Sequence, residues 1–259
     1  MKLGIIGIGN IGSMLLEILQ NEEHDFYIID KNREKIKKYE KKCRVKIGEN
    51  IEDIYSNSKY IFVTVKPKDM DDVLNEISKI DNDNAVIIST AAGKSLNEIL
   101  KKSNKKNVIR IMPTIISKIG KGITAITFNN SIKSDVKEEV ISMLRPLGEI
   151  MEIDEKKFDA FTILNSSGPA FAAYILESYI EGAINIGFNV EDAKEIILKT
   201  FEGTIEFIKK ENIELSQLKY RVSSPGGVTI KGLYELEQKS VKGAIMKSLY
   251  EAYLKNNKF

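Results

Sequence analysis

The sequence predicts an α/β protein in two parts: a doubly wound parallel β-sheet over residues 1–153, and an all-helical part over residues 154–259. Two observations predict this division. In the first part, short runs rich in Ile and Val alternate with amphipathic stretches, and such strand–helix–strand repeats favour parallel pairing through right-handed crossovers. In the second part, the apolar residues follow a helical period and no β-rich run occurs.

Strands and helices are expected to alternate along the first part. The strands are expected at Leu3–Ile8, Phe26–Ile29, Tyr60–Val65, Ala85–Ser89, Val108–Met112, Ile123–Phe128 and Glu149–Ile153. The helices are expected at Ile11–Leu19, Arg33–Lys42, Asp69–Ile80, Leu96–Lys102 and Asp135–Leu144. Because strands and helices keep alternating, we expect the last two strands to extend the same sheet.

The second part is expected to form helices and to dimerise. Helical periodicity covers Phe158–Ile186, Val190–Lys209, Glu214–Val222, Thr229–Lys239 and Val241–Lys255. Asn189 and Asp192 form a plausible capping pair at the start of the second helix. The stretch PAFAAYILESYIEGAI is apolar on more than one face, which a surface helix cannot hide. We therefore expect a homo-oligomer, at least a dimer, held by the helical part.

Composition argues against nucleic acid and membrane as partners. The chain has 39 basic and 37 acidic residues and a net charge of +2. Binding to phosphate backbones needs a concentrated basic face, whereas the Lys-rich run 31–42 has the spacing of the solvated side of a helix. No apolar run reaches the roughly 18 residues of a membrane span, and the chain starts directly as a strand. We therefore expect a cytoplasmic protein.

A dinucleotide-binding fingerprint follows the first predicted strand and opens the first helix. It consists of Gly7, Ile8, Gly9, Asn10, Ile11 and Gly12. In G-x-G-x-x-G, the first glycine allows a tight turn, the second lets the backbone approach a pyrophosphate, and the third lets the helix pack on the sheet. This context predicts a Rossmann-type domain that binds NADH or NADPH.

An acidic residue expected to contact the ribose is Asp30, at the end of the second predicted strand. A carboxylate there accepts hydrogen bonds from both ribose hydroxyls of NAD and repels a 2′-phosphate. Lys31 and Arg33 follow at once, and their charges could instead reach that phosphate. We expect Asp30 and Lys31 to bind the cofactor, and Asp30 favours NADH.

Two further segments lie at the carboxyl ends of predicted strands, where the loops of this fold line the ligand crevice. One consists of Val65, Lys66 and Pro67, which either flank the cofactor or simply end the strand at the proline. The other consists of Ala91, Ala92 and Gly93, whose small size would let a nicotinamide ring lie close to the backbone.

Common catalytic side chains are scarce. His24, the only histidine, precedes the second strand at the end of the sheet opposite the crevice, and is expected on the surface. This excludes a histidine acid or base, a Ser-His-Asp triad and a histidine metal site. Cys43, the only cysteine, excludes a disulfide framework and a thiolate metal cluster, and is expected to be at least half-buried. Hydride transfer suits such a chain because the cofactor carries the chemistry.

A cluster of small polar residues interrupts the helices in VSSPGGVTIKGL, residues 222–233. Its proline keeps Ser224 extended, and Gly226 and Gly227 are expected to leave backbone amides uncovered before a helix resumes near Thr229. Hydroxyls and amides at a helix N-terminus suit a small carboxylate. Taken alone, the stretch is equally well explained as a turn with a Ser or Thr cap.

The stretch SSPGGVTIKGLYELE closely resembles the signature of pyrroline-5-carboxylate reductases, which is usually S-P-G-G-T-T or S-P-G-G-A-T followed by I-x-G-L-x-x-L-E. The stretch NSSGPAFAAYILESYIEGAINIGF is similar to that family's other landmark, G-S-G-P-A-Y and a following helix. The glycine fingerprint, the Val65-Lys66-Pro67 and Ala91-Ala92-Gly93 segments and the length also match. The resemblance thus covers essentially the whole chain.

The resemblance implies an NAD(P)H-dependent reductase that converts the cyclic imine 1-pyrroline-5-carboxylate to L-proline, the last step of proline synthesis, as an interlocked dimer. Carried onto this sequence, it implies that Ser224, Gly226 and Gly227 bind the substrate carboxylate. Thr229 would bind substrate too, as the catalytic residue that hydrogen-bonds the ring nitrogen and assists its protonation. A protonated iminium accepts hydride readily, so no histidine is needed.

The sequence departs from the family pattern at several positions. Thr114 stands where the family's M-P-N-T-P has an asparagine that contacts the nicotinamide side of the cofactor. Phe171 replaces the tyrosine of G-P-A-Y, and Ser166 replaces a glycine before it. Asp30 differs from the Asn-Arg-Ser-like ending common in members that prefer NADPH. The substrate loop itself is intact.

Two alternatives stay open. A related reductase of another imine or of a β-hydroxyacid would share the two-domain plan. However, the helix after Gly168 carries Glu177 and Glu181 and lacks the lysine that β-hydroxyacid dehydrogenases usually need there. A non-catalytic dinucleotide sensor that dimerises through its helical half would not need the second ligand loop.

Overall fold

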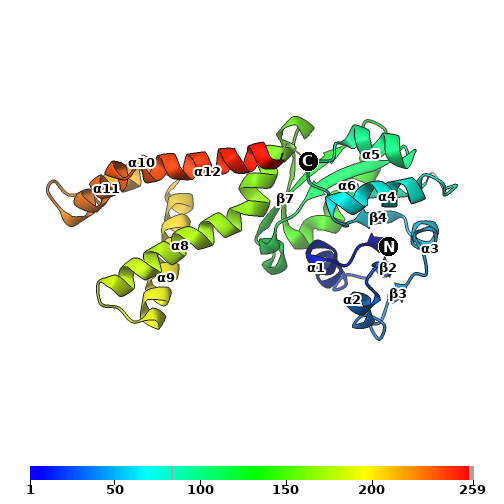
Figure 1. Ribbon diagram of the computed structural model, residues 1–259, viewed down its shortest axis with the longest axis horizontal. Coiled ribbons are helices and arrows are strands. Elements are labelled where there is room, and N and C mark those ends of the chain that lie inside the picture. The colour runs from blue at the N-terminus through cyan, green and yellow to red at the C-terminus, as the bar shows by residue number, and fades with distance from the viewer. Residues whose placement is uncertain (83, 257–259) are drawn as a thin grey trace. The chain divides into compact units, whose positions relative to one another are not determined.

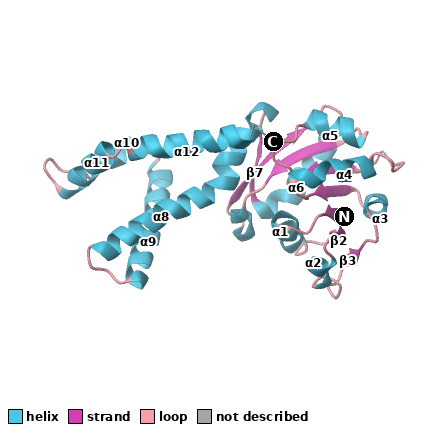
Figure 2. Ribbon diagram, in the orientation of Figure 1, coloured by secondary structure: helices cyan, strands magenta, loops and turns pink. Residues whose placement is uncertain are grey.

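The computed structural model describes residues 1–82 and 84–256 (Figure 1). The chain divides into two compact units. In the described chain the first comprises Met1–Ser167 and Tyr253–Asn256, and the second comprises Gly168–Ala252. Among the described residues, strands occur only in the first unit (Figure 2).

The described strands of the first unit form one sheet in the order β3-β2-β1-β4-β5-β6-β7-β8. Their bounds are β1 (Lys2–Ile6), β2 (Asp25–Ile29), β3 (Val45–Ile47), β4 (Tyr60–Val63), β5 (Val86–Ser89), β6 (Val108–Met112), β7 (Gly122–Phe128) and β8 (Gly148–Glu152). The strand order turns around at β1, which lies between β2 and β4. In doubly wound folds the ligand crevice opens at such a switch point.

The pairing is parallel except between β6 and β7, which run antiparallel. The expectation of parallel pairing is therefore wrong at this one place. Residues 113–121 separate the two strands, and a parallel connection needs about a dozen residues or more. The chain instead turns back through a short 3₁₀ helix at Ile115–Ile119.

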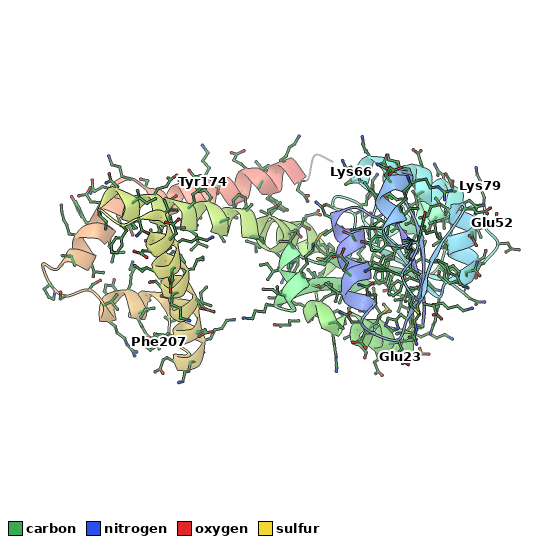
Figure 3. The ribbon with its side chains drawn as sticks, turned by 90° about the horizontal axis from the view of Figure 1, so that it is seen from below. Glu23, Glu52, Lys66, Lys79, Tyr174 and Phe207 are labelled. Carbon is green, nitrogen blue, oxygen red and sulfur yellow. The ribbon has the colours of Figure 1, made fainter. Side chains whose placement is uncertain are left out.

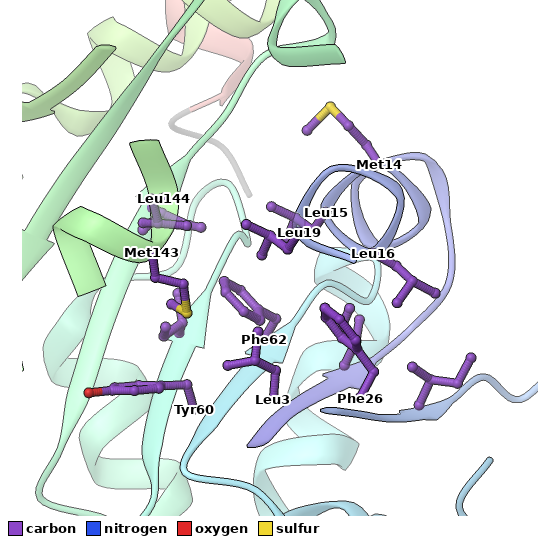
Figure 4. Packing of buried hydrophobic residues seen from close by; sticks show 14 of the residues in the cluster. Leu3, Met14, Leu15, Leu16, Leu19, Phe26, Tyr60, Phe62, Met143 and Leu144 are labelled. Atoms are coloured by element: carbon purple, nitrogen blue, oxygen red, sulfur yellow. The ribbon is translucent and has the colours of Figure 1, made fainter. Parts of the chain in front are cut away.

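Helices cover both faces of the sheet. They are α1 (Asn10–Leu19), α2 (Arg33–Lys37), α3 (Ile51–Asn57), α4 (Pro67–Ile77), α5 (Leu96–Ser103) and α6 (Ser134–Leu144). Apolar residues of α1 and α6 pack on one face and those of α3, α4 and α5 on the other. Figure 4 shows Leu15 and Leu19 of α1 beside Leu144 of α6, packed over Leu3 and Phe62 of the sheet.

Several local expectations for this unit are wrong. The predicted helix 33–42 ends at Lys37, and the sequence did not indicate β3 or α3, which are only three and seven residues long. His24 is buried, because its ring lies 6.4 Å from that of Phe26 and its Nδ1 lies 3.3 Å from the amino nitrogen of Met1. Cys43 is exposed, since it lies in the turn before β3.

The described residues from Phe158 onward form helices joined by short loops, and the second unit begins at α8. After α7 (Phe158–Phe161) and a π-helix at Thr162–Ser167 come α8 (Gly168–Asn185), α9 (Val190–Glu211), α10 (Leu215–Arg221), α11 (Val228–Gln238) and α12 (Val241–Asn256). The predicted helix 158–186 is thus divided. The predicted cap of α9 is confirmed, because Asn189 Oδ1 accepts from the amide of Asp192 at 2.8 Å.

Large apolar side chains of the second unit face outward. Tyr174 of α8 is 72% exposed and Phe207 of α9 is 42% exposed (Figure 3). Others are Ile186, Leu215, Val228, Met246 and Tyr250. Such a surface is typical of an interface with another protein. In the described part of the chain, no helix combines the length and apolar character needed to cross a bilayer.

Candidate functional site

The glycine-rich loop connects β1 to α1, with Gly9 as the N-cap residue of the helix. Gly7 has a φ of +100°, which side chains of L residues rarely allow. A Cβ on Gly12 would lie 2.0 Å from the carbonyl oxygen of Gly7, so the close approach of helix and loop requires glycine. At Gly9, none of the described heavy atoms lies within 4 Å of where a Cβ would be. Gly7 and Gly12 are therefore required by the shape of the loop, whereas Gly9 leaves open space beside it.

Thr64 anchors this loop from the end of β4. Its hydroxyl donates to the carbonyl of Gly7 at 2.5 Å and lies 3.2 Å from that of Ile6. The side chain is buried. We did not predict this residue from the sequence, although a threonine at the carboxyl end of the strand beside β1 is a usable signal.

Asp30 joins the loops that follow β1 and β2. Its Oδ2 accepts from the backbone amide of Ile8 at 2.7 Å, and its Oδ1 accepts from that of Asn32 at 2.8 Å. The ammonium of Lys35 lies 3.7 Å from Oδ2. With only 8% of the residue exposed, Asp30 has a structural role in the loop besides lining the cleft.

A cleft of about 740 Å³ opens at the carboxyl ends of β1, β2 and β4. Of the predicted cofactor residues, those that line it are Gly7, Gly9, Asp30, Lys31, Val65 and Lys66. Lys66 is labelled in Figure 3. Those outside its lining are Ile8, Asn10, Ile11, Gly12, Pro67, Ala91, Ala92 and Gly93. The cleft thus gathers residues from three loops that the sequence separates widely.

Residues of both charges line this cleft. Its cationic lining residues are Lys31, Arg33, Lys35, Lys66 and Lys68, and its carboxylates are Asp30, Glu49, Asp69, Asp72 and Glu76. The Lys31 ammonium donates to Asp69 at 2.8 Å, and this hydrogen bond holds the pKa of Asp69 below its usual range. The cleft residues on α4 were not predicted, because the sequence does not show which charges of a helix face a ligand.

The two other predicted cofactor segments begin or precede helices. β4 ends at Val63, Lys66 is the N-cap residue of α4, and Pro67 occupies the first helical position, where its missing N–H costs nothing. After β5, Ala91 is buried in the core and Gly93 adopts a φ of +70°. The proline therefore starts a helix rather than merely ending a strand.

A buried arginine lies at the carboxyl end of the sheet next to these segments. Arg110 of β6 is 3% exposed, and its guanidinium lies 4.3 Å from the ring centroid of Phe158. Its Nη1 donates to Glu155 at 2.8 Å, and the same carboxylate accepts from the amide of Leu96 at 2.5 Å. Glu155 thereby connects β6 to the start of α5.

Two of the family departures, Thr114 and Ser166, lie in or contact the loop after β6. Thr114 is 1% exposed, and its hydroxyl has no hydrogen-bond partner in residues 1–82 and 84–256. Ser166 donates to the carbonyl of Pro113 at 3.2 Å, and Asn165 donates to that of Ile123 at 2.8 Å. Both side chains attach the π-helix to this loop and to β7. Phe171 lies in the first turn of α8.

The SSPGG loop of the second unit connects α10 to α11. The amide of Gly227 donates to the carbonyl of Ser224 at 3.0 Å, and Gly226 has a φ of +68°. With Pro225 between them, this pattern is typical of a type II turn. The expectation that both glycine amides are uncovered is therefore wrong for Gly227, because the turn uses its N–H.

The start of α11 leaves other donors available. Gly227 is its N-cap residue and, within the described chain, no side chain caps this end. The first amides of a helix have no partner inside it, and the helix dipole adds positive potential there. Thr229 is the second helical residue and is partly exposed. The loop thus offers amides and hydroxyls that suit an anion. The alternative of a turn with a Ser or Thr cap is not supported at this helix start, because no described side chain caps it.

Comparison with protein-family models matches the two parts of the chain separately. Residues 155–259 match the model for pyrroline-5-carboxylate reductase dimerisation, and residues 2–93 match the model for NADP oxidoreductase, coenzyme F420-dependent.

Individual relatives extend over nearly the whole chain. A pyrroline-5-carboxylate reductase of Aquifex aeolicus is 31% identical over 252 residues, which are 96% of this chain and 94% of that protein. The structure of 1-pyrroline-5-carboxylate reductase from Streptococcus pyogenes matches with a TM-score of 0.92 and 26% identity, over 100% of this chain and 99% of that one. The Plasmodium falciparum pyrroline carboxylate reductase with NADP bound matches with a TM-score of 0.89 and 28% identity, over 99% and 97%.

Proposed function

Because the chain belongs to the pyrroline-5-carboxylate reductase family, we propose that it reduces 1-pyrroline-5-carboxylate to L-proline with NADH or NADPH. The observation that carries this proposal is the SSPGG loop, which offers amides and hydroxyls for a carboxylate at the start of α11. A sensor of dinucleotides would have no use for this second ligand site.

The first unit fits a nicotinamide dinucleotide. The open space above Gly9 and the cleft beside it suit a pyrophosphate at the N-terminus of α1. A bound reduced nicotinamide supplies the hydride. We assign Gly7 to Gly12, Asp30 and Lys31 to the nucleotide, and Val65 to Pro67 and Ala91 to Gly93 to the cofactor loops beside it.

The NADH preference is part of this proposal. Asp30 lines the cleft and would repel a 2′-phosphate. Asp30→Ser is therefore expected to raise kcat/KM for NADPH relative to NADH. An unchanged ratio would remove Asp30 from recognition of the ribose.

The substrate residues are assigned to the second unit. The Ser224 hydroxyl, the Gly226 amide and the first amides of α11 would bind the carboxylate, while the Gly227 amide holds the turn in shape. Thr229 would hold a proton at the ring nitrogen through its hydroxyl. Positioned donors of this kind act where charge changes during the reaction.

We further propose that the chain works in the cytoplasm as a homodimer through a helical domain of residues 154–259, with residues 1–153 as the dinucleotide-binding domain. The exposed apolar side chains of α8 to α12 support the dimer, because monomeric proteins rarely expose so many. Neither nucleic acid nor membrane is proposed as a partner.

The direct test is turnover. Purified protein is mixed with 1-pyrroline-5-carboxylate and NADH or NADPH, and the loss of absorbance of the reduced cofactor is followed. Turnover with at least one cofactor is expected. Absence of turnover with both would reject the function, and turnover only with another cyclic imine or a β-hydroxyacid would support the related reductase instead.

A further inference from the structure

We propose that Asp69 sets the discrimination between nucleotides with and without a 2′-phosphate, by holding the Lys31 ammonium in an ion pair across the cleft. The inference rests on the proposed use of a nicotinamide dinucleotide. It assigns a specificity-determining role to a residue that does not belong to the glycine fingerprint and does not follow β2.

The ion pair bridges the two sides of the switch point. Lys31 follows β2, and Asp69 lies in the first turn of α4, which follows β4. Because β1 lies between β2 and β4, the 2.8 Å contact spans the edge of the sheet from which the glycine-rich loop emerges. Both residues line the same cleft as Gly7 and Gly9.

The neighbouring cations have partners on their own side of the cleft. Lys35 lies 3.7 Å from Asp30, and Arg33 donates to the carbonyl of Glu49 at 3.4 Å. Both carboxylate oxygens of Asp30 already accept from backbone amides. Among these three cations after β2, Lys31 is paired with an acid from the opposite side of the cleft, Asp69.

This pairing opposes a 2′-phosphate in two ways. It withdraws the positive charge of Lys31 from the ribose side of the cleft, and it places a carboxylate where a second anion would have to approach. A ribose that carries only hydroxyls meets neither penalty. The pair is also easy to break, because the Lys31 side chain is 75% exposed and exposed pairs contribute little stability. Removing the Asp69 charge therefore releases Lys31 at little cost to the fold.

Asp72 provides a matched control. It lies one turn further along α4, lines the same cleft and carries the same charge. Its charge acts on Lys31 only at longer range, whereas Asp69 accepts a hydrogen bond from the Lys31 ammonium. Asp72→Asn therefore removes one negative charge from the cleft without releasing Lys31.

The experiment measures binding of two nucleotides that lack nicotinamide, 5′-AMP and adenosine 2′,5′-bisphosphate, by isothermal titration calorimetry on the full chain. Asp69→Asn is expected to increase the preference for the bisphosphate by about three- to tenfold. Little change is expected in the Kd for 5′-AMP, which also shows that the cleft remains folded.

A double-mutant cycle separates release of Lys31 from simple repulsion. In a Lys31→Met background, Asp69→Asn is expected to change the preference by less than twofold. An equal gain in that background, or an equal gain from Asp72→Asn, would overturn the proposal, and so would a decrease in preference on Asp69→Asn. If the original protein bound neither nucleotide, the proposal would fall as well. Turnover of 1-pyrroline-5-carboxylate does not enter this measurement, so failure of the reductase function would be seen separately.

Discussion

The carboxylate of Asp30 accepts a hydrogen bond from the backbone amide of Ile8 at 2.7 Å and so ties the end of β2 to the glycine-rich loop. Ile8 is 4% exposed, so loss of the acceptor leaves its amide unpaired in a buried position. Asp30→Ala should therefore lower the free energy of unfolding by about 1–3 kcal/mol. Urea denaturation would measure this, with Asp30→Asn as the control that keeps one acceptor oxygen. Equal stability of Asp30→Ala and the unmodified protein would contradict a structural role.

The glycines of the loop separate fold from ligand binding. Gly12→Ala is expected to destabilise the protein, because its Cβ would lie 2.0 Å from the carbonyl oxygen of Gly7. Gly9→Ala should leave stability within about 0.5 kcal/mol but weaken dinucleotide binding about tenfold or more, since its Cβ would occupy the space left for the pyrophosphate. Thermal unfolding and NADH titration measure the two effects. Unchanged NADH affinity in Gly9→Ala would place the pyrophosphate elsewhere.

Thr229 provides a test of the assigned catalytic hydroxyl. Thr229→Ala is expected to lower kcat by about 10²–10³-fold, by analogy with the loss of one positioned donor in an oxyanion hole. Thr229→Ser keeps the hydroxyl and should retain most of the activity. Steady-state kinetics with saturating reduced cofactor would measure both variants. Full activity of Thr229→Ala would remove this side chain from the mechanism.

His24 gives the fold a predictable dependence on pH. Burial, together with the nearby amino terminus, lowers the pKa of His24 below its usual value of 6.5. A base with a lowered pKa binds its proton more readily in the unfolded state than in the folded state. The free energy of unfolding that depends on neutral His24 is therefore complete above about pH 6.5, and it is lost as the pH falls from that value toward the folded pKa.

His24→Gln cannot take up this proton. Between pH 8 and pH 5, its loss of stability should be smaller than that of the unmodified protein. Urea unfolding at both pH values measures the difference. Parallel losses in the two proteins would show that His24 does not titrate on unfolding.

Patterns within short segments predicted much of the fold and of the site. The strand, glycine turn and helix around Gly7 to Gly12 follow from neighbouring residues, and so do the strands that carry Asp30 and Lys66 to one edge. The sequence did not indicate β3, because three residues carry too little periodicity, nor the reversal of β7, which depends on the length of the preceding loop.

Contacts between distant segments could not be predicted. The pairing of Lys31 with Asp69 joins residues that lie 38 positions apart, and either lysine or aspartate alone looks like an ordinary surface charge. The burial of His24 and the Arg110–Glu155 contact likewise depend on packing between elements. In the SSPGG loop, the composition predicted a turn. It did not indicate that the turn is closed by the hydrogen bond from the amide of Gly227 to the carbonyl of Ser224.

The central claim is that hydride passes from the nicotinamide cofactor to the imine carbon of 1-pyrroline-5-carboxylate. The most direct measurement supplies the protein with this substrate and reduced cofactor that carries deuterium at the transferable position, and analyses the product by mass spectrometry and NMR. The account predicts L-proline with one deuterium at C5. Absence of proline, or proline without deuterium at that carbon, would contradict it.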